Sequence, residues 1–148
     1  MACPKQVAKA VSAMQGHTTS NACSFAQYAS ATAISGGEDF VANMAKVFDD
    51  RRKLLYQGLT QIDGIKVVYP KGAFYVFVDV SAFFGKSFEG KEITGSVSFA
   101  DLLLGKGVAV IPGLAFGDDN CVRLSYTVST DDIVKGVAGI KAFISELK

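Results

Sequence analysis

The segment NCVRLSYT (120–127) contains the residue of this chain best suited to binding an acid group. It is typical of a β-strand, and its one charged side chain is Arg123. The chain has only two other arginines, the neighbours Arg51 and Arg52. A guanidinium presents a planar fork of N–H donors, so proteins use arginine rather than lysine to hold a carboxylate or phosphate by two hydrogen bonds. The segment therefore suggests an anion-binding arginine.

Alternation along the strand decides which side chains share a face with Arg123. One face is apolar and consists of Val122, Leu124 and Tyr126. The other face is polar and consists of Arg123, Ser125 and Thr127. The apolar set is expected to pack against helices, so the polar set faces either water or a binding cleft. No acid on the strand can pair with Arg123. The alternative is a solvated or edge-guarding charge, which sheets often carry, and composition alone leaves both interpretations open.

The other groups capable of chemistry have simpler interpretations. The run DDRRK (49–53) is either a phosphate or partner site or, as we favour, a solvated helix face, because exposed ion pairs are common. Asp49 and Lys53 are spaced to pair on that helix. His17 has no Cys, Asp or Glu partner at motif spacing and is expected in a loop. Cys3, Cys23 and Cys121 fit no metal or disulfide spacing, which indicates apolar fillers, no metal site and a reducing cytoplasm.

The elements that must position these residues follow from apolar periodicity and from Pro and Gly. Helices are predicted at 4–15, 24–36, 38–62, 98–107 and 130–147, and strands at 65–69, 73–80, 108–113 and 120–127. Ser24 and Ser129 are the expected helix caps, and Pro70-Lys71-Gly72 predicts a tight turn between the first two strands. The order indicates an α+β fold, with a small mixed, partly antiparallel sheet covered by helices on one face.

Composition excludes several classes of function. A length of 148 residues is that of one ordinary domain, and the net charge of +1 is spread without a basic stripe, which argues against nucleic-acid binding. The apolar stretches are too short to span a bilayer. Lys5 and Lys9 interrupt the region where a signal peptide would be apolar, so we expect a cytoplasmic protein.

Four segments in register resemble one known family. The strings HTTSNACSFAQYA, GAFYVFVDVS, VAVIPGLAFG and VRLSYTVSTDDIVKGVAGI look like the C-terminal part of fold-type I, pyridoxal-phosphate-dependent aminotransferases, most closely the bacterial aspartate aminotransferases. The resemblance runs over essentially the whole chain. It implies a helical lead-in segment at 1–36 and the aminotransferase C-terminal small domain at 37–148.

The resemblance also implies roles for individual residues. The arginine of the family's RLS strand binds the α-carboxylate of the amino-acid substrate, and it maps onto Arg123. Phe74 matches an aromatic near the substrate, with plain core packing as the alternative. Ser20 and Asn21 match a loop that reaches the other subunit's active site in family homodimers, with helix capping as the alternative. The family's Pro-Gly-x-x-Phe-Gly loop beside the cleft matches residues 112–117.

One departure from the family pattern limits the expected activity. The family holds pyridoxal phosphate through a lysine that follows a serine, and no Ser-Lys pair occurs here. We therefore expect part of an aspartate:2-oxoglutarate transaminase that binds amino-acid and 2-oxo-acid substrates in the parent enzyme. Alone, it should hold no covalent cofactor and be inactive, because a substrate clamp positions but performs no chemistry. The alternative functions are an independent carboxylate-binding module and an interaction module that docks through apolar surface.

Overall fold

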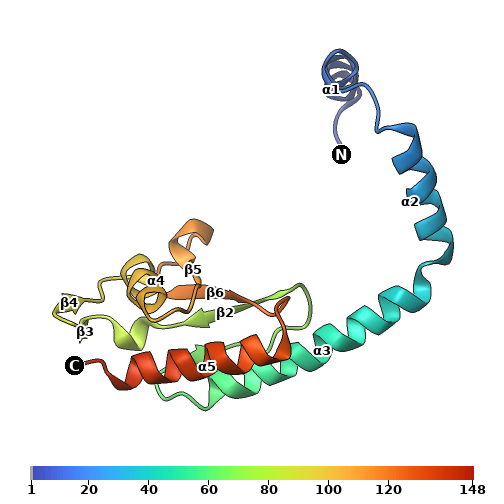
Figure 1. Ribbon diagram of the computed structural model, residues 1–148. Helices are drawn as coiled ribbons and strands as arrows, with labels where there is room; N and C mark the ends of the chain where they lie inside the picture. The colour runs from blue at the N-terminus through green and yellow to red at the C-terminus, as the bar shows by residue number, and fades with distance from the viewer. Residues whose placement is uncertain (1) are drawn as a thin grey trace. The chain divides into compact units, whose positions relative to one another are not determined.

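The structure, a computed structural model, describes residues 2–148. Successive helices come first, and short strands and further helices follow (Figure 1). In order, the elements are α1 (Lys5–Thr18), α2 (Ser24–Gly36), α3 (Glu38–Thr60), β1 (Lys66–Val67), β2 (Tyr75–Asp79), η1 (Ser81–Phe83), β3 (Ser87–Phe88), β4 (Lys91–Glu92), α4 (Ser96–Gly105), β5 (Ile111–Pro112), η2 (Gly113–Phe116), β6 (Cys121–Ser125) and α5 (Thr130–Ser145).

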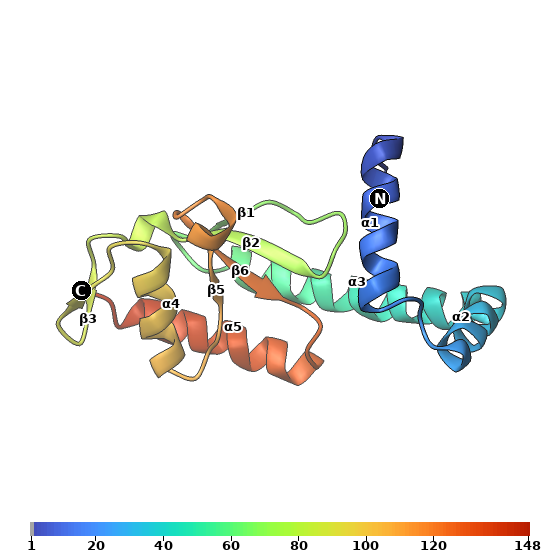
Figure 2. The ribbon, with the colours of Figure 1, turned by 90° about the horizontal axis from the view of Figure 1, so that it is seen from above.

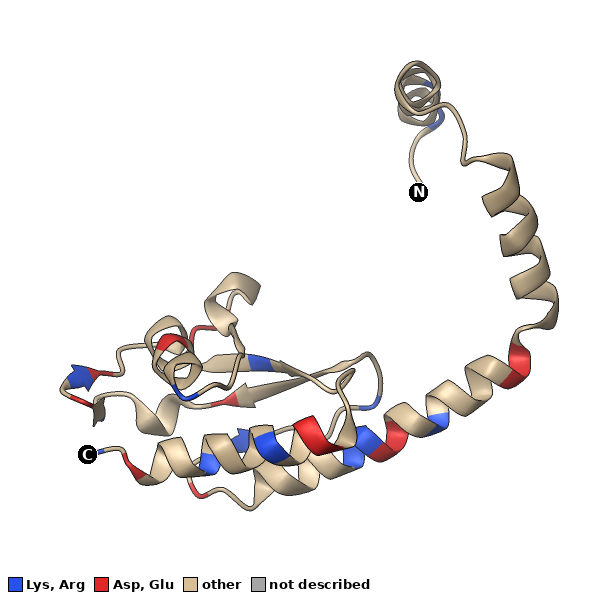
Figure 3. Ribbon diagram, viewed as in Figure 1, with Lys and Arg blue, Asp and Glu red and all other residues tan. Residues whose placement is uncertain are grey.

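The chain divides into two units between Asn43 and Met44. In the described part of the first unit, α1 and α2 bury no residue, and α2 has no charged side chain (Figure 3). The predicted division at residue 36 stays a prediction, and Met1, which belongs to the predicted lead-in, lies outside the described residues.

The second unit is built on a four-stranded sheet of order β1-β2-β6-β5, in which every neighbouring pair is antiparallel. The inward side chains Val76, Val78 and Val122 are fully buried in one continuous apolar core. The second half of α3 and the whole of α5 lie side by side across the core face (Figures 1 and 2). A Cβ added to Gly58 of α3 would come within 2.9 Å of Val137 of α5, so glycine permits this close packing. The predicted α+β class is confirmed.

Sequence periodicity placed the helices well and the strands less well. Ser129 caps α5 as predicted, and its hydroxyl accepts the Asp132 N–H at 3.1 Å. The predicted cap Ser24 is wrong, because Ser24 is the first residue of α2 and Cys23 is the cap position. His17 lies in the last turn of α1, not in a loop. Not every apolar side chain along α3 faces the core, because Phe40 and Val41 are 70% and 64% exposed.

The predicted tight turn at 70–72 is also wrong. Pairing of β1 with β2 begins only at Val67 and Val78, which leaves residues 68–74 as a loop. Ala73 in this loop has a positive φ of 63°. The predicted strand 108–113 is reduced to Ile111–Pro112, and Ile111 is exposed because it pairs with Arg123 and shares the sheet face turned away from the core. Turn propensity could not anticipate side chains elsewhere that bind the loop carbonyls.

Among residues 2–148, no helix is long and apolar enough to cross a membrane.

A first prediction concerns Leu59, which α3 contributes to this core. Leu59 is 0% exposed, so Leu59→Ala is expected to lower the free energy of unfolding by about 2–5 kcal/mol through lost burial and a residual cavity. Urea unfolding followed by circular dichroism measures the change. Leu104→Ala is the matched control, because Leu104 is 57% exposed and should cost less than about 1 kcal/mol. Equal effects in the two variants would contradict the assigned core.

Candidate functional site

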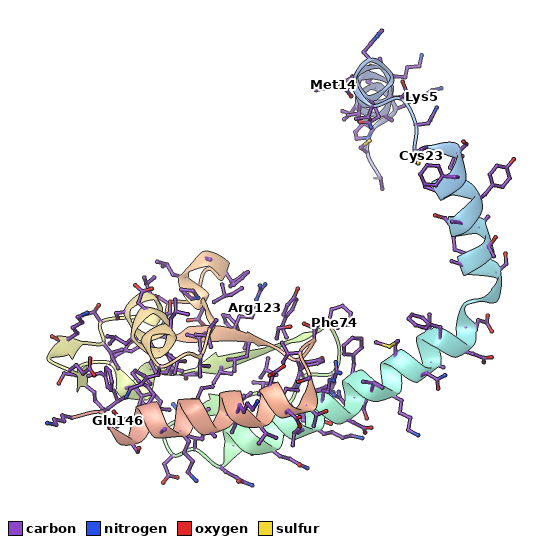
Figure 4. All side chains as sticks on the ribbon, in the orientation of Figure 1. Lys5, Met14, Cys23, Phe74, Arg123 and Glu146 are labelled. Atoms are coloured by element: carbon purple, nitrogen blue, oxygen red, sulfur yellow. The ribbon has the colours of Figure 1, made fainter. Side chains whose placement is uncertain are left out.

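Arg123 lies in the middle of an internal strand. Its strand, β6, pairs with β2 on one side and β5 on the other, so Arg123 stands directly opposite Phe77 and Ile111. An edge-guarding role therefore does not apply, because this strand is not an edge. Figure 4 shows the Arg123 side chain on the side of the sheet opposite α5. Alternation thus turns Arg123 away from the core while Val122 faces into it.

Two aromatic rings hold the half-buried guanidinium. Its central carbon, Cζ, lies 4.2 Å from the ring centre of Tyr75 and 4.5 Å from that of Phe116. The Phe116 ring in turn meets Phe77 edge-on, with centroids 6.2 Å apart. Rings at these distances attract a cation while leaving its N–H groups available. We refer to Tyr75, Phe77, Phe116 and Arg123 together as the arginine cage.

The three arginines differ in their partners. Arg52 donates to the Pro70 carbonyl at 2.6 Å and forms an ion pair with Asp49. Arg51 donates to the Thr127 carbonyl at 3.2 Å. Among residues 2–148, no carboxylate lies within 4.0 Å of the Arg123 guanidinium, and the guanidinium donates no hydrogen bond. Of the three arginines, Arg123 is therefore the one with neither an ion pair nor a hydrogen bond among these residues.

The charged run 49–53 belongs to the packing of α3. Asp49 forms ion pairs with both Arg52 and Lys53, as its spacing predicted for Lys53. The hydrogen bond from Lys53 is the main reason that the pKa of Asp49 lies below its ordinary value. The guanidinium of Arg52 also lies over the Tyr69 ring, at 4.7 Å. These contacts fasten the helix to the loop 68–74 and leave no cluster of free cations for a phosphate.

A buried hydroxyl orients the loop that carries Phe116. Ser96, at the start of α4, is fully buried, donates to Asp119 Oδ1 at 2.6 Å and accepts the Leu114 N–H at 3.2 Å. Gly113 at the start of η2 has no room for a Cβ, which would lie 2.2 Å from the Cys121 carbonyl oxygen. Gly117 ends η2 in the left-handed region at φ 86°. The residues of the Pro-Gly-x-x-Phe-Gly pattern thus give the loop the backbone geometry that brings Phe116 over Arg123.

The other candidate residues lie in different places. Phe74 is half-exposed and packs edge-on against Phe48, with ring centroids 5.1 Å apart, beside a hollow lined by Arg52, Lys71 and Tyr126. Its chain neighbour Tyr75, not Phe74 itself, is the ring over Arg123. Sequence reasoning missed Tyr75 and Phe77, although their alternation along one strand was a signal.

Ser20 and Asn21 belong to the first unit. Both are exposed and line a surface hollow between α1 and the loop that follows it. Ser20 has a positive φ of 59°, and its hydroxyl donates to the Gly16 carbonyl at 3.3 Å. Neither hydroxyl nor amide caps α2, whose cap position is Cys23.

The lysines among residues 2–148 all lie at the surface. Each lysine is exposed, and several have partners already: Lys106 pairs with Glu146 at 2.8 Å, and Lys66 lies 3.9 Å from Asp79. A lysine that forms an imine must instead be desolvated or held beside another cation. Cys121 is no substitute nucleophile, because burial, followed by its contact with Asp118, raises the pKa of its thiol to about 11.

No group of three or more His, Cys, Asp or Glu side chains within residues 2–148 is placed to hold a metal ion.

Known proteins resemble both the sequence and the fold. Aspartate aminotransferase of Streptomyces avermitilis is 42% identical over 146 residues, which cover 98% of this chain and 36% of that protein. The crystal structure of the Rhizobium meliloti aspartate aminotransferase matches with a TM-score of 0.91 and 35% identity, over 98% of this chain and 37% of that one. The aspartate aminotransferase from Thermus thermophilus with maleate matches with a TM-score of 0.81 and 34% identity, over 95% and 35%.

The matches place this chain within longer relatives. It spans little more than a third of the length of the aspartate aminotransferases that it matches. The family profile described as Aminotransferase class I and II matches residues 1–140, which is nearly the whole chain. With a profile match of this extent and relatives of this identity, the chain belongs to the class I and II aminotransferases, of which it is an aspartate aminotransferase-like portion.

Proposed function

We propose that this chain supplies the substrate α-carboxylate-binding arginine, Arg123, of a pyridoxal-phosphate-dependent aspartate aminotransferase. The observation that carries the proposal is the free guanidinium of Arg123, held by Tyr75 and Phe116 with no carboxylate of residues 2–148 in reach. A guanidinium that is partly removed from water favours an ionic partner. An incoming carboxylate would supply one and accept two parallel hydrogen bonds.

The arginine cage prepares the guanidinium of Arg123 for binding. The rings of Tyr75 and Phe116 limit the rotation of a long side chain, so less conformational entropy is lost when a ligand is bound. Arg123 then fixes one end of an amino acid or 2-oxo acid and orients the rest. The exposed rings reduce solvent access beside the ion pair, which strengthens it.

The parent enzyme completes the site. The cofactor, when bound, acts as the electron sink for transamination, and the residues that hold it are not among those described here. We propose that the parent enzyme takes aspartate and 2-oxoglutarate and works as a homodimer. Ser20 and Asn21 lie in a loop that in such a dimer would contribute to the neighbouring subunit's site, and Phe74 would border the substrate. Exposure of Ser20 and Asn21 in this chain supports that role.

A second prediction tests the arginine with the dicarboxylate maleate. The chain has three arginines, so ¹⁵N-arginine labelling gives three side-chain Nε–Hε signals in NMR spectra. Adding maleate is expected to shift the Arg123 signal in a saturable way. Arg123→Lys keeps the charge but loses the fork, and should weaken binding at least about tenfold, which corresponds to about 1.4 kcal/mol.

The matched control is Arg51→Lys. Arg51 donates to the Thr127 carbonyl and lies outside the arginine cage, so the same exchange there should leave maleate affinity unchanged. In uniformly ¹⁵N-labelled samples, the backbone amide signals of residues 122–125 report binding in the lysine variants. Equal affinity in the Arg123→Lys variant and the unsubstituted chain would rule out the clamp.

A third prediction concerns catalysis by these 148 residues alone. Mixed with pyridoxal phosphate, L-aspartate and 2-oxoglutarate, the chain is expected to give no glutamate above the cofactor-only background, because no lysine is placed to hold the cofactor. A coupled assay for oxaloacetate measures turnover. A cofactor absorbance band that survives desalting, together with turnover, would contradict the proposal that residues outside this chain hold the cofactor.

A further inference from the structure

We propose that Tyr126 is a positioning residue for the arginine cage: its hydroxyl holds Ala73 in a left-handed backbone conformation and thereby aims Tyr75 at Arg123. This inference rests on the proposed carboxylate site but assigns a role to a residue that touches no substrate. The acting group is the hydroxyl of a core residue that directly follows β6, on the side opposite the face that carries Arg123.

The hydroxyl is aimed at the backbone of the loop 68–74. Tyr126 is 2% exposed, and its side chain lies in the core. Its O–H donates to the Ala73 carbonyl at 2.6 Å and lies 3.4 Å from the Gly72 carbonyl. Burial is the largest cause that raises the pKa of this phenol above its ordinary value. The group therefore keeps its proton and remains a donor throughout the physiological pH range.

The loop needs such a hold because Ala73 is strained. At φ 63°, its Cβ crowds the following carbonyl, a conformation that glycine adopts without this cost. The neighbouring Gly72 is the residue that the sequence offers for such a turn, yet the positive φ falls on Ala73. A strained residue persists only where its surroundings over-determine it. Here the surroundings are the Tyr126 hydroxyl and the Arg52 donor on the Pro70 carbonyl.

Tyr126 binds two successive backbone carbonyls just before Tyr75, one through its backbone N–H and one through its hydroxyl. Its backbone N–H donates to the Phe74 carbonyl at 3.0 Å, and its hydroxyl binds the carbonyl just before, that of Ala73. The next residue, Tyr75, pairs with Ser125 at the first position of β2 and carries the ring that lies 4.2 Å from Arg123 Cζ. The conformation at Ala73 thus sets where β2 begins and which way Phe74 and Tyr75 point.

The competing explanation is that Tyr126 serves only as an apolar core filler. Its ring is among the largest fully buried side chains, so removal of the whole side chain would simply destabilise the fold. Tyr126→Phe separates the two explanations, because it keeps the ring and deletes only the hydroxyl. Tyr56→Phe is the matched control: Tyr56 packs against Tyr69, and no hydrogen bond within residues 2–148 uses its hydroxyl.

The experiment uses the full chain labelled with ¹⁵N-arginine. The ring currents of Tyr75 and Phe116 should give Arg123 a distinctive Nε–Hε signal, identified by its loss in Arg123→Lys. In Tyr126→Phe this signal is expected to move toward the random-coil position, well below the unfolding temperature, and maleate affinity should fall about three- to tenfold, as for one lost hydrogen bond. Tyr56→Phe should leave both unchanged.

A second substitution, designed to restore the Arg123 signal in Tyr126→Phe, gives the decisive comparison. Ala73→Gly removes the strain at φ 63°, so the double variant Tyr126→Phe with Ala73→Gly should regain most of the Arg123 signal and affinity. A role confined to stability would shift the unfolding temperature without moving the Arg123 signal. The inference is overturned if Tyr126→Phe leaves that signal in place, or if the glycine fails to restore it.

The two proposals can fail separately. If maleate does not bind the unsubstituted chain, the carboxylate clamp fails, while the Arg123 signal of the ligand-free variants still decides whether the Tyr126 hydroxyl positions the cage. If maleate binds but Tyr126→Phe changes neither signal nor affinity, the clamp stands and the positioning role of Tyr126 is wrong.

Discussion

Five residue pairs join β2 to β6, and this antiparallel ladder is the constraint on which both the core and the candidate site depend. Since side chains alternate across a strand, the same register that buries Val76 and Val122 turns Phe77 and Arg123 to the opposite face. A slip by one residue would bury the guanidinium and expose the valines. The hydrophobic effect that stabilises the sheet therefore also fixes the direction of the arginine.

The arginine cage is assembled from both sides of that ladder. Tyr75 comes from β2 itself, whereas Phe116 comes from η2, which is oriented by the buried Ser96 hydroxyl and by close packing at Gly113. Hydrogen bonds to the backbone thus determine where the two rings lie. This arrangement gives a charged side chain a defined position without an internal carboxylate, which would compete with a ligand for the same donors.

Membership in the class I and II aminotransferases accounts for the features that an isolated domain would not need. The exposed apolar residues of α2, Phe25, Tyr28 and Ile34, stand on a helix without charges. The chain spans about 36% of the length of its curated relatives. The proposed substrate-orienting role of Arg123 would suit one part of a two-part catalytic site, because orientation and covalent chemistry are separable contributions to catalysis.

The sequence by itself determined the helices, the alternation around Arg123 and the family, because helical periodicity, capping at Ser129 and four motifs in register are local signals. The family resemblance also drew attention to Phe116 through its loop motif. Only the tertiary structure decided that β6 is internal, that Tyr75 rather than Phe74 covers the guanidinium, and that residues 68–74 form a loop with Ala73 left-handed. These features depend on partners distant in sequence, such as Tyr126 for Ala73 and Ser96 for Leu114, and local propensity contains no information about such contacts.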